Sequence, residues 1–175
     1  MPAQRQGGAR HLRAMAAALA IAGTIPVLAA GSHAVPGQPA PDFALRALAG
    51  PNVRLSEHAG QVVVISFWGV GCDACRSQLE ALEQDFSRFQ AEGLRVYGVE
   101  VADDQAAALH FAHGTHVTFP LLLDPAKSVA RLYDVDNLPL TLLIDRDGKI
   151  RQVVRDFNES NRRACEDELR KLLAE

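Results

Sequence analysis

The sequence predicts an α/β domain with a mixed central sheet and helices on both of its faces. A continuous apolar and β-branched run at residues 61–68 is typical of a central strand that is buried on both sides. Downstream of it, helical patterns alternate with further apolar strands, and the C-terminal part ends in a strand–turn–strand–helix pattern. The 175 residues provide enough chain for one core of ordinary size.

Each element is predicted from its own pattern. Residues 43–45 and 53–55 flank a turn at 50–52 and predict a small N-terminal β-hairpin extension. A helix at 73–90 follows the central strand, because apolar side chains recur on one helical face: Leu79, Leu82, Phe86 and Phe89. The later elements are, in order, strand 94–101, helix 105–113, strand 119–123, helix 125–133, strands 140–145 and 150–155, and helix 160–173.

Cap and turn residues set the predicted boundaries. Gly93 ends the first long helix, and Asp103 or Asp104 caps the next one. Pro125 is expected in the first turn of the helix that it opens. Gly148 supplies the positive φ that the turn between the last two strands requires.

Composition and charge exclude some classes of function. The apolar fraction of 48% and the charged fraction of 22% are typical of a globular protein. The net charge is -3 and the sequence pI is near 6.1, so the chain carries no basic footprint for nucleic acid. We therefore expect no nucleic-acid partner.

The N-terminal segment has the composition of a targeting sequence. Arg5, Arg10 and Arg13 precede an uncharged stretch at 14–30 that is rich in Ala and Leu, and small residues follow at the two positions that a signal peptidase reads, Ser32 and Ala34. This order predicts a secretory signal peptide, with a retained membrane anchor as the alternative. Either would place the domain in the periplasm or another extracytoplasmic compartment, where disulfides persist.

These patterns divide the chain into three parts. Residues 1–34 form the signal peptide or anchor. Residues 35–40 are rich in Pro and Gly and are expected to be a linker. Residues 41–175 form the folded domain.

Cys72 and Cys75 open the predicted helix directly after the central strand. Two cysteines at this spacing on a first helical turn can reach each other as a disulfide. Unpaired N–H groups and the positive end of the helix dipole lie beside the first sulfur and stabilise its thiolate, which is the attacking species in disulfide exchange. We expect Cys72 to attack a substrate disulfide and Cys75, one turn into the helix, to resolve the mixed disulfide. The carboxylate of Asp73 opposes thiolate formation and works against the helix dipole, so the sequence leaves the net pKa of Cys72 open; a loss of thiolate stabilisation would favour a reductant over an oxidant.

Several segments, in order and with sensible spacing, resemble the TlpA/ResA-like branch of thioredoxin-fold proteins. The match runs from about Pro39 to the C-terminus. It rests on the following motifs: Ala40-Pro41-Asp42-Phe43-x-Leu45, Leu55-x-x-x-x-Gly60, Phe67-Trp68 ahead of Cys72-x-x-Cys75, and Pro139-x-Thr141-x-x-Ile144-Asp145-x-x-Gly148-Lys149. The resemblance implies a thioredoxin-like fold and a periplasmic-type thiol–disulfide oxidoreductase. Such proteins often serve cytochrome c maturation or copper-protein assembly.

The resemblance also implies how such a protein would work. It needs no cofactor besides the redox-active Cys72–Cys75 pair. Its partners would be protein thiol and disulfide substrates and a membrane electron donor that recycles the pair, and we expect a monomer. Pro139 would be cis and beside the cysteines, with its neighbour Leu138 binding substrate backbone. Trp68 is expected beneath the site, with part of its ring available to substrates.

Some positions depart from the family pattern. Gly71 stands where Trp usually precedes the first cysteine, and Ala74 stands where Pro often precedes the second. Ser66 occupies the place of a common buried Asp, so that proton relay is absent. Asp103, or failing that Glu100, lies near the position of a functional acid in relatives, although a helix-cap role for Asp103 is an equal alternative.

Alternative functions remain open on the sequence alone. A metallochaperone could hold copper(I) or zinc between the two cysteines and a histidine. A thiol peroxidase is a weaker option, because its usual Pro-x-x-x-Thr-x-x-Cys context is missing before Cys72. Cys165 shares a helical face with apolar residues and is expected to be a buried, inert thiol. We expect His110, His113 and His116 to belong to a solvated helix end, with a metal site as the alternative that their spacing allows.

Overall fold

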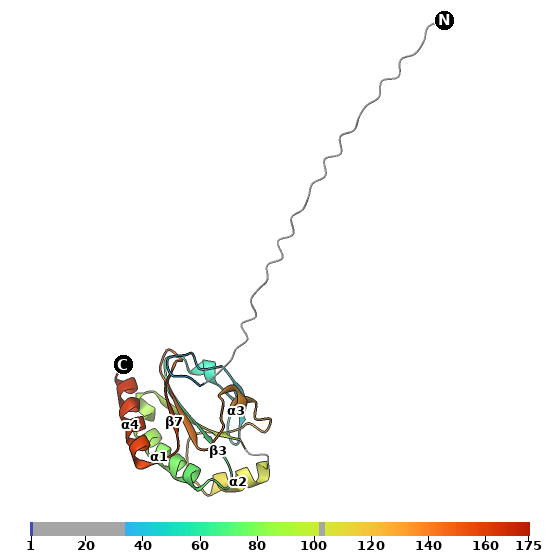
Figure 1. The fold of residues 1–175 in the computed structure, drawn as a ribbon. Helices are drawn as coiled ribbons and strands as arrows, with labels where there is room; N and C mark the ends of the chain where they lie inside the picture. The colour runs from blue at the N-terminus through green and yellow to red at the C-terminus, as the bar shows by residue number, and fades with distance from the viewer. Residues whose placement is uncertain (2–33, 102–103) are drawn as a thin grey trace. The chain divides into compact units, whose positions relative to one another are not determined.

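Figure 1 presents the computed structural model, which describes Met1, residues 34–101 and residues 104–175. The predicted targeting stretch at 14–30 and Asp103 lie outside the described residues. Every element described below belongs to the compact unit that ends at Glu175. None of the helices in the described ranges is long and apolar enough to cross a membrane.

A mixed sheet forms the centre of the domain. Its middle strand is β3 (Val62–Trp68), which pairs in parallel with β4 (Leu94–Glu100) and antiparallel with β6 (Leu140–Ile144). Beyond β4 lies the parallel strand β5 (Leu121–Leu123), and beyond β6 lies the antiparallel strand β7 (Ile150–Arg155). The predicted mixed α/β sheet is therefore confirmed. The register brings the end of β3 and the beginning of β6 to the same edge of the sheet, since Phe67 lies opposite Leu140.

The remaining strands form the other side of the sheet. The strand β1 (Ala44–Ala47) pairs antiparallel with both β2 (Val53–Arg54) and β5. The full strand order is β2-β1-β5-β4-β3-β6-β7. The N-terminal strands are thus an edge of the main sheet.

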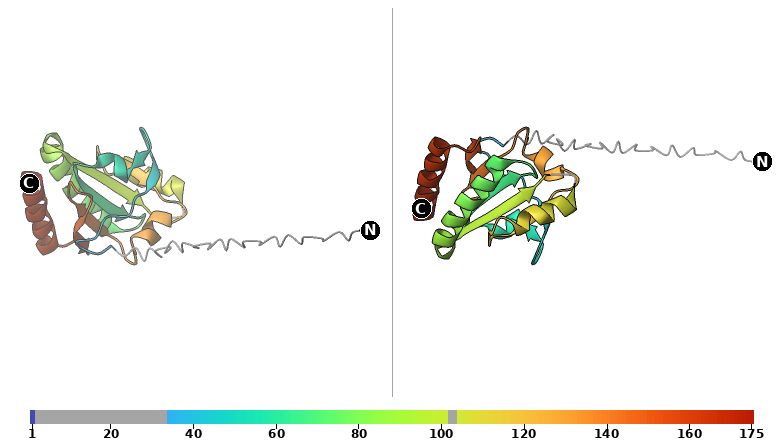
Figure 2. Two further views of the ribbon diagram at one scale, coloured as in Figure 1. Left: turned by 90° about the horizontal axis from the view of Figure 1, so that it is seen from above. Right: turned by 90° about the horizontal axis from the view of Figure 1, so that it is seen from below.

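Helices cover both faces of the sheet (Figures 1 and 2). One face carries α1 (Asp73–Phe89), α2 (Gln105–His113) and α4 (Glu159–Ala174), whose apolar side chains share one core cluster. The other face carries α3 (Ser128–Leu132) and the short 3-10 helix η1 (Leu55–His58). A second 3-10 turn, η2 (Gln90–Glu92), ends at Gly93 with a φ of 99°, as the sequence predicts for the end of this helix.

The middle strand is buried throughout and, apart from Ser66, apolar, because both of its faces are covered. Val62, Val64 and Trp68 pack into the cluster with α1, α2 and α4. The alternate side chains of the strand pack into the opposite cluster: Val63, Ile65 and Phe67. Burial of each large apolar side chain contributes about 1.5–3 kcal/mol to folding, so this strand anchors both layers.

The segment predicted as a linker belongs to the folded domain. The amide of Gly37 donates a hydrogen bond to the carbonyl of Ile150, and the amide of Ala40 donates one to the carbonyl of Gly148. Pro39 forms an isolated β-bridge with Lys149. The prediction for residues 35–40 was wrong because this pairing partner lies more than a hundred residues away and leaves no local signal.

The helix predicted at 125–133 is shorter than expected. It begins at Ser128, so Pro125 lies outside it. The carboxylate of Asp124 accepts hydrogen bonds from the amides of Ser128, Val129 and Ala130. This carboxylate satisfies the first amides of α3 and positions its start.

Candidate active site

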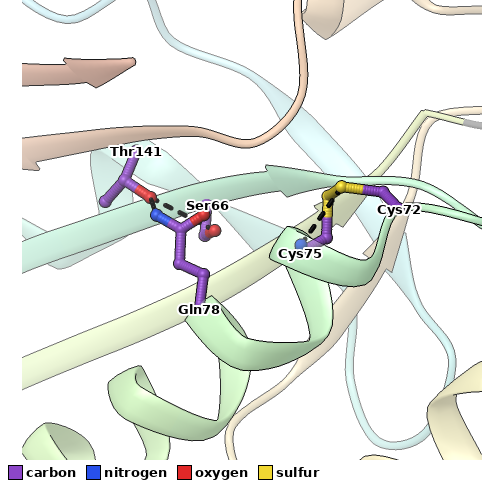
Figure 3. Close-up of a disulfide and its surroundings, with 5 residues drawn as sticks. All are labelled: Ser66, Cys72, Cys75, Gln78 and Thr141. Carbon is purple, nitrogen blue, oxygen red and sulfur yellow. Dashed lines mark hydrogen bonds between the residues drawn. A yellow bond between two sulfur atoms is a disulfide. The ribbon is translucent and has the colours of Figure 1, made fainter. Parts of the chain in front are cut away.

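The two cysteines form a disulfide at the beginning of α1 (Figure 3). Cys72 is the N-cap residue of α1, and its extended backbone connects the helix to the loop that leaves β3. Cys75 lies in the first turn with 0% of its surface exposed, whereas Cys72 is half-buried. Of the two residues, Cys72 is therefore the one that has exposed surface for a substrate to approach.

The Cys72 sulfur accepts a hydrogen bond from the backbone amide of Cys75, over 3.1 Å. This amide is one of the groups at a helix start that have no partner within the helix. The positive end of the α1 dipole lies at the same place. Both effects stabilise negative charge on Cys72 when the disulfide is reduced.

A cluster of uncharged polar side chains lies beside the redox pair, one helical turn further along α1. Gln78 donates a hydrogen bond through its Nε2 to Oγ1 of Thr141, and Thr141 donates one to Ser66 over 3.3 Å. Figure 3 shows the Gln78 side chain directed towards these two residues, so the cluster ties α1 to β6 and β3. Gln78 is 4% exposed, and its Oε1 has no hydrogen-bond partner among the described residues.

The sequence analysis missed Gln78. The available signal was a polar residue on a helical face that otherwise carries apolar side chains, directly before Leu79 and three positions after Cys75. Ser66 lies at the expected place on β3, and it takes part in a neutral network. None of the three side chains that share these hydrogen bonds is a carboxylate.

The prediction for Trp68 was wrong in one respect, because its ring is 0% exposed. Phe111 of α2 stacks on it with 4.8 Å between ring centroids, and the Arg76 guanidinium lies 4.4 Å from the centre of the Phe111 ring. A Cβ atom at Gly98 would lie 3.1 Å from the indole Nε1, so glycine is needed behind the ring. Trp68 is a core residue, and Phe111 and Arg76 lie between it and the surface.

The peptide bond between Leu138 and Pro139 is cis, as the family resemblance implies. Pro139 directly precedes Leu140, which pairs with Phe67 near the end of β3. Leu138 is half-buried and packs close to the loop before the cysteines, since a Cβ atom at Gly69 would lie 2.9 Å from its Cδ1. Sequence-distant residues are thus brought to the edge of the sheet from which α1 departs.

Of the two acids predicted to assist the cysteines, Asp103 and Glu100, the structure describes only Glu100. It is 1% exposed at the end of β4, where its backbone lies opposite Trp68 and Leu123. Its carbonyl accepts a hydrogen bond from the amide of Asp124 over 3.0 Å. Asp104 is the N-cap of α2, and its carboxylate accepts hydrogen bonds from Ala106 and Ala107. Cap formation at this helix therefore does not require Asp103.

Cys165 lies on α4, far along the chain from the redox pair, and packs against the core cluster that α4 shares with α1 and α2. It is half-buried and free, and it lines a small cavity together with Gln78 and Asp85. Burial, with smaller contributions from Asp85 and Glu166, raises the pKa of the Cys165 thiol to about 12. This thiol is therefore protonated and unreactive at neutral pH.

The histidines of the suggested metal spacing do not converge. His110 and His113 lie on the exposed side of α2, and His116 lies in the loop beyond it with a φ of 52°. Within residues 34–101 and 104–175, no three His, Cys, Asp or Glu side chains come together in a group that could hold a metal ion.

Comparisons with known proteins agree with this geometry. Residues 36–153 match the AhpC/TSA family. The chain is 32% identical over 118 residues to the thiol-disulfide oxidoreductase ResA of Geobacillus kaustophilus, covering 67% of this chain and 68% of that protein. It is 33% identical over 118 residues to the protein of the same name from Bacillus subtilis, covering 67% and 66%.

Solved structures give the same result. A protein from Chlorobium tepidum, provisionally assigned as a thiol:disulfide interchange protein DsbE, superposes with a TM-score of 0.76 at 32% identity, covering 79% of this chain and 98% of that one. A protein from Bacteroides thetaiotaomicron, provisionally assigned as a protein disulfide isomerase, superposes with a TM-score of 0.75 at 30% identity, covering 81% and 91%.

Proposed function

Because this chain belongs to the AhpC/TSA family of thioredoxin-fold proteins and is a thiol–disulfide oxidoreductase with a Cys72–Cys75 pair, we propose that it reduces disulfides in extracytoplasmic proteins. The substrates would be proteins of the kind that need free cysteines for cytochrome c maturation or metalloprotein assembly. The observation that carries the proposal is the redox pair at the start of α1, with Cys72 alone accessible. No cofactor beyond the pair itself is required.

The reaction proceeds by two exchanges. In the reduced enzyme, the Cys72 thiolate attacks one sulfur of the substrate disulfide, and the other substrate sulfur leaves as a thiolate that takes up a proton. Cys75 then loses its proton and attacks the Cys72 sulfur, which releases the second substrate thiol. Two electrons pass to the substrate and the Cys72–Cys75 disulfide remains. A membrane electron donor would return the pair to the dithiol.

The charge next to the pair supports reduction over oxidation. Asp73 is exposed between the two cysteines, and its carboxylate disfavours the neighbouring thiolate. Strongly oxidising relatives of this kind of site owe their potential to a stabilised reduced form. A site with a carboxylate beside the nucleophile stabilises that form less, so its disulfide is the weaker oxidant and its dithiol the stronger reductant.

Proton transfer to and from Cys75 needs a group other than Ser66, whose cluster is neutral. We assign this role to Asp103 or, failing that, to Glu100, which is buried at the end of β4. The residue would act by general acid–base catalysis on the buried sulfur. Leu138 would contact the substrate backbone at the same edge of the sheet.

The extracytoplasmic location rests on the sequence of the first 34 residues, which has the order of a signal peptide or anchor.

An equilibrium titration of the Cys72–Cys75 pair against reduced and oxidised glutathione tests the direction of electron flow. A potential more negative than that of the glutathione couple supports a reductant. A potential close to that of the strong oxidants, roughly -120 mV, contradicts the proposal.

A further inference from the structure

A hollow lies between the start of α1 and α2, and two sequence neighbours of the redox pair, Val70 and Arg76, line it. Its volume is about 390 Å³. Val70 and Phe111 provide apolar surface in it, and Arg76, His110 and His113 provide nitrogen donors. We call this feature the Arg76 hollow.

The guanidinium of Arg76 is held in place. One of its nitrogens donates a hydrogen bond to the carbonyl of Gly114 over 3.0 Å, and its plane lies over the Phe111 ring. Phe111 is itself fixed by its stack on the buried ring of Trp68. Arginine stacked on an aromatic ring keeps further donors free for a carboxylate. The hollow is therefore a preformed surface and needs little ordering upon binding.

The described residues that line the hollow carry no carboxylate. Of the described acids close in sequence, Asp73 and Glu80 are exposed on α1 and do not line it, and the Asp104 carboxylate is engaged by amides of α2. The hollow thus presents a guanidinium and two imidazoles next to apolar surface, although the chain as a whole is acidic.

The position of the hollow relates it to the exchange reaction. Val70 precedes Cys72 by two residues, and Arg76 directly follows Cys75. A substrate disulfide must bring one sulfur to within bonding distance of the Cys72 sulfur. Since an extended chain advances about 3.3 Å per residue, the residues next to the substrate cysteine can reach Val70 and Arg76.

We propose that the Arg76 hollow selects substrates: it binds the segment next to the reactive cysteine of a substrate protein and prefers one with an acidic side chain beside an apolar one. The inference rests on the proposed exchange reaction and names its substrate class. The carboxylate pairs with Arg76 and accepts hydrogen bonds from His110 or His113, and the apolar side chain packs on Val70 and Phe111.

The test uses three disulfide-linked model peptides that are identical except for Glu, Gln or Lys two residues from the cysteine. The second-order rate constant for their reduction by the reduced protein is measured, together with that for a small neutral disulfide. We expect the Glu peptide to react roughly tenfold or more faster than the Lys peptide, with the Gln peptide between them. The His110→Gln/His113→Gln double variant and Arg76→Gln should each reduce this ratio.

A matched control and a separate readout make the outcomes distinguishable. His116→Asn changes a histidine that does not line the hollow, so it should keep the full Glu-to-Lys ratio. For Arg76→Gln, only the Glu-to-Lys rate ratio is compared with that of the parent protein. The absolute rates are not compared, because loss of the guanidinium charge also changes how readily the neighbouring thiols ionise. If the three peptides react at equal rates while the neutral disulfide is reduced normally, the proposed selection by the hollow is overturned and the exchange reaction stands. Failure to reduce any disulfide overturns the exchange reaction itself.

Discussion

The backbone amide of Cys75 donates its hydrogen bond to the sulfur of Cys72, so each member of the redox pair has a different part in the site. Cys72 is the half-buried N-cap whose sulfur receives this donor, and Cys75 is fully buried and supplies it. The asymmetry follows from the position of a Cys-x-x-Cys sequence at a helix start, where amides have no intrahelical partner. On this asymmetry we base the proposal that Cys72 attacks and Cys75 resolves.

We expect Gln78→Glu to destabilise the protein at neutral pH. The new carboxylate would replace a buried amide whose hydrogen-bond partner, Thr141, is uncharged, which costs about 1–3 kcal/mol or makes the group take up a proton. Its pKa is raised in the folded state, so the loss should be large at pH 8 and small at pH 5. Urea unfolding of the oxidised protein at both pH values measures it.

Gln84→Glu is the matched control for this substitution. Gln84 lies on the exposed side of the same helix, so the same chemical change should alter stability by less than about 0.5 kcal/mol at either pH. A Gln78→Glu protein as stable as this control at pH 8 would show that the cluster tolerates charge and that its neutrality is unimportant.

Asp85→Asn should stabilise the protein at pH 7. Burial, followed by the nearby Glu166 carboxylate, raises the pKa of Asp85 to about 6 in the folded protein, from an ordinary value of 3.8. The folded state therefore holds a proton that the unfolded state releases, and stability falls as the pH rises from about 4 to 6.

The stability of the Asn variant does not fall in this way, so the variant should be as stable as the parent protein at pH 3.5 and more stable at pH 7. After allowance for solvent screening of a partly exposed group, the gain is on the order of 1 kcal/mol. Thermal unfolding across this pH range measures it. A constant difference between variant and parent at all pH values would mean that Asp85 does not titrate as described.

Cys165 should resist alkylation in the native protein. Its pKa of about 12, against an ordinary value of 9.0, lowers the thiolate population at pH 8 roughly a thousandfold. Iodoacetamide added to the oxidised protein should leave this thiol unmodified, while the unfolded protein reacts quickly. Cys165→Ser should keep the rate of disulfide exchange. Rapid native labelling, or a loss of exchange in the Ser variant, would give Cys165 a role in the chemistry.

The assisting acid can be identified by its pH profile. Asp103→Asn is made first, and general acid–base assistance predicts a loss of about 10²-fold in exchange rate with a shifted thiol titration. If the rate and titration are unchanged, Glu100→Gln should show these effects instead. Asp104→Asn, which retains a side-chain oxygen to cap α2, serves as the control for local disturbance. Full activity in both acid variants would remove the general-acid step.

Sequence patterns predicted the elements whose signals are local. The helix Gln105–His113 and the strand Ile150–Arg155 have the predicted bounds, since caps and turns mark both ends. The redox pair also follows from local order, because a buried strand ending before a helix start places the cysteines there. The cis bond at Pro139 came from the family resemblance and not from the pattern of residues.

The features that sequence analysis missed depend on contacts between distant segments. The burial of Trp68 requires Phe111, which lies on a helix more than forty residues later. The cluster at Gln78 requires Thr141, which lies sixty-three residues away on another strand. Neither side chain carries a periodic signal that points to its partner, and only the packing of α1 and α2 on the sheet brings them together.

The central claim is that Cys72 attacks the substrate and Cys75 resolves the mixed disulfide. Mass spectrometry of the adducts that Cys72→Ser and Cys75→Ser form with a disulfide-containing substrate tests it most directly, with Cys165→Ser introduced in both backgrounds. The account predicts a stable mixed disulfide on Cys72 in the Cys75→Ser protein and little or none in the Cys72→Ser protein. A stable adduct on Cys75 in the Cys72→Ser protein, with none on Cys72 in its counterpart, would contradict the account.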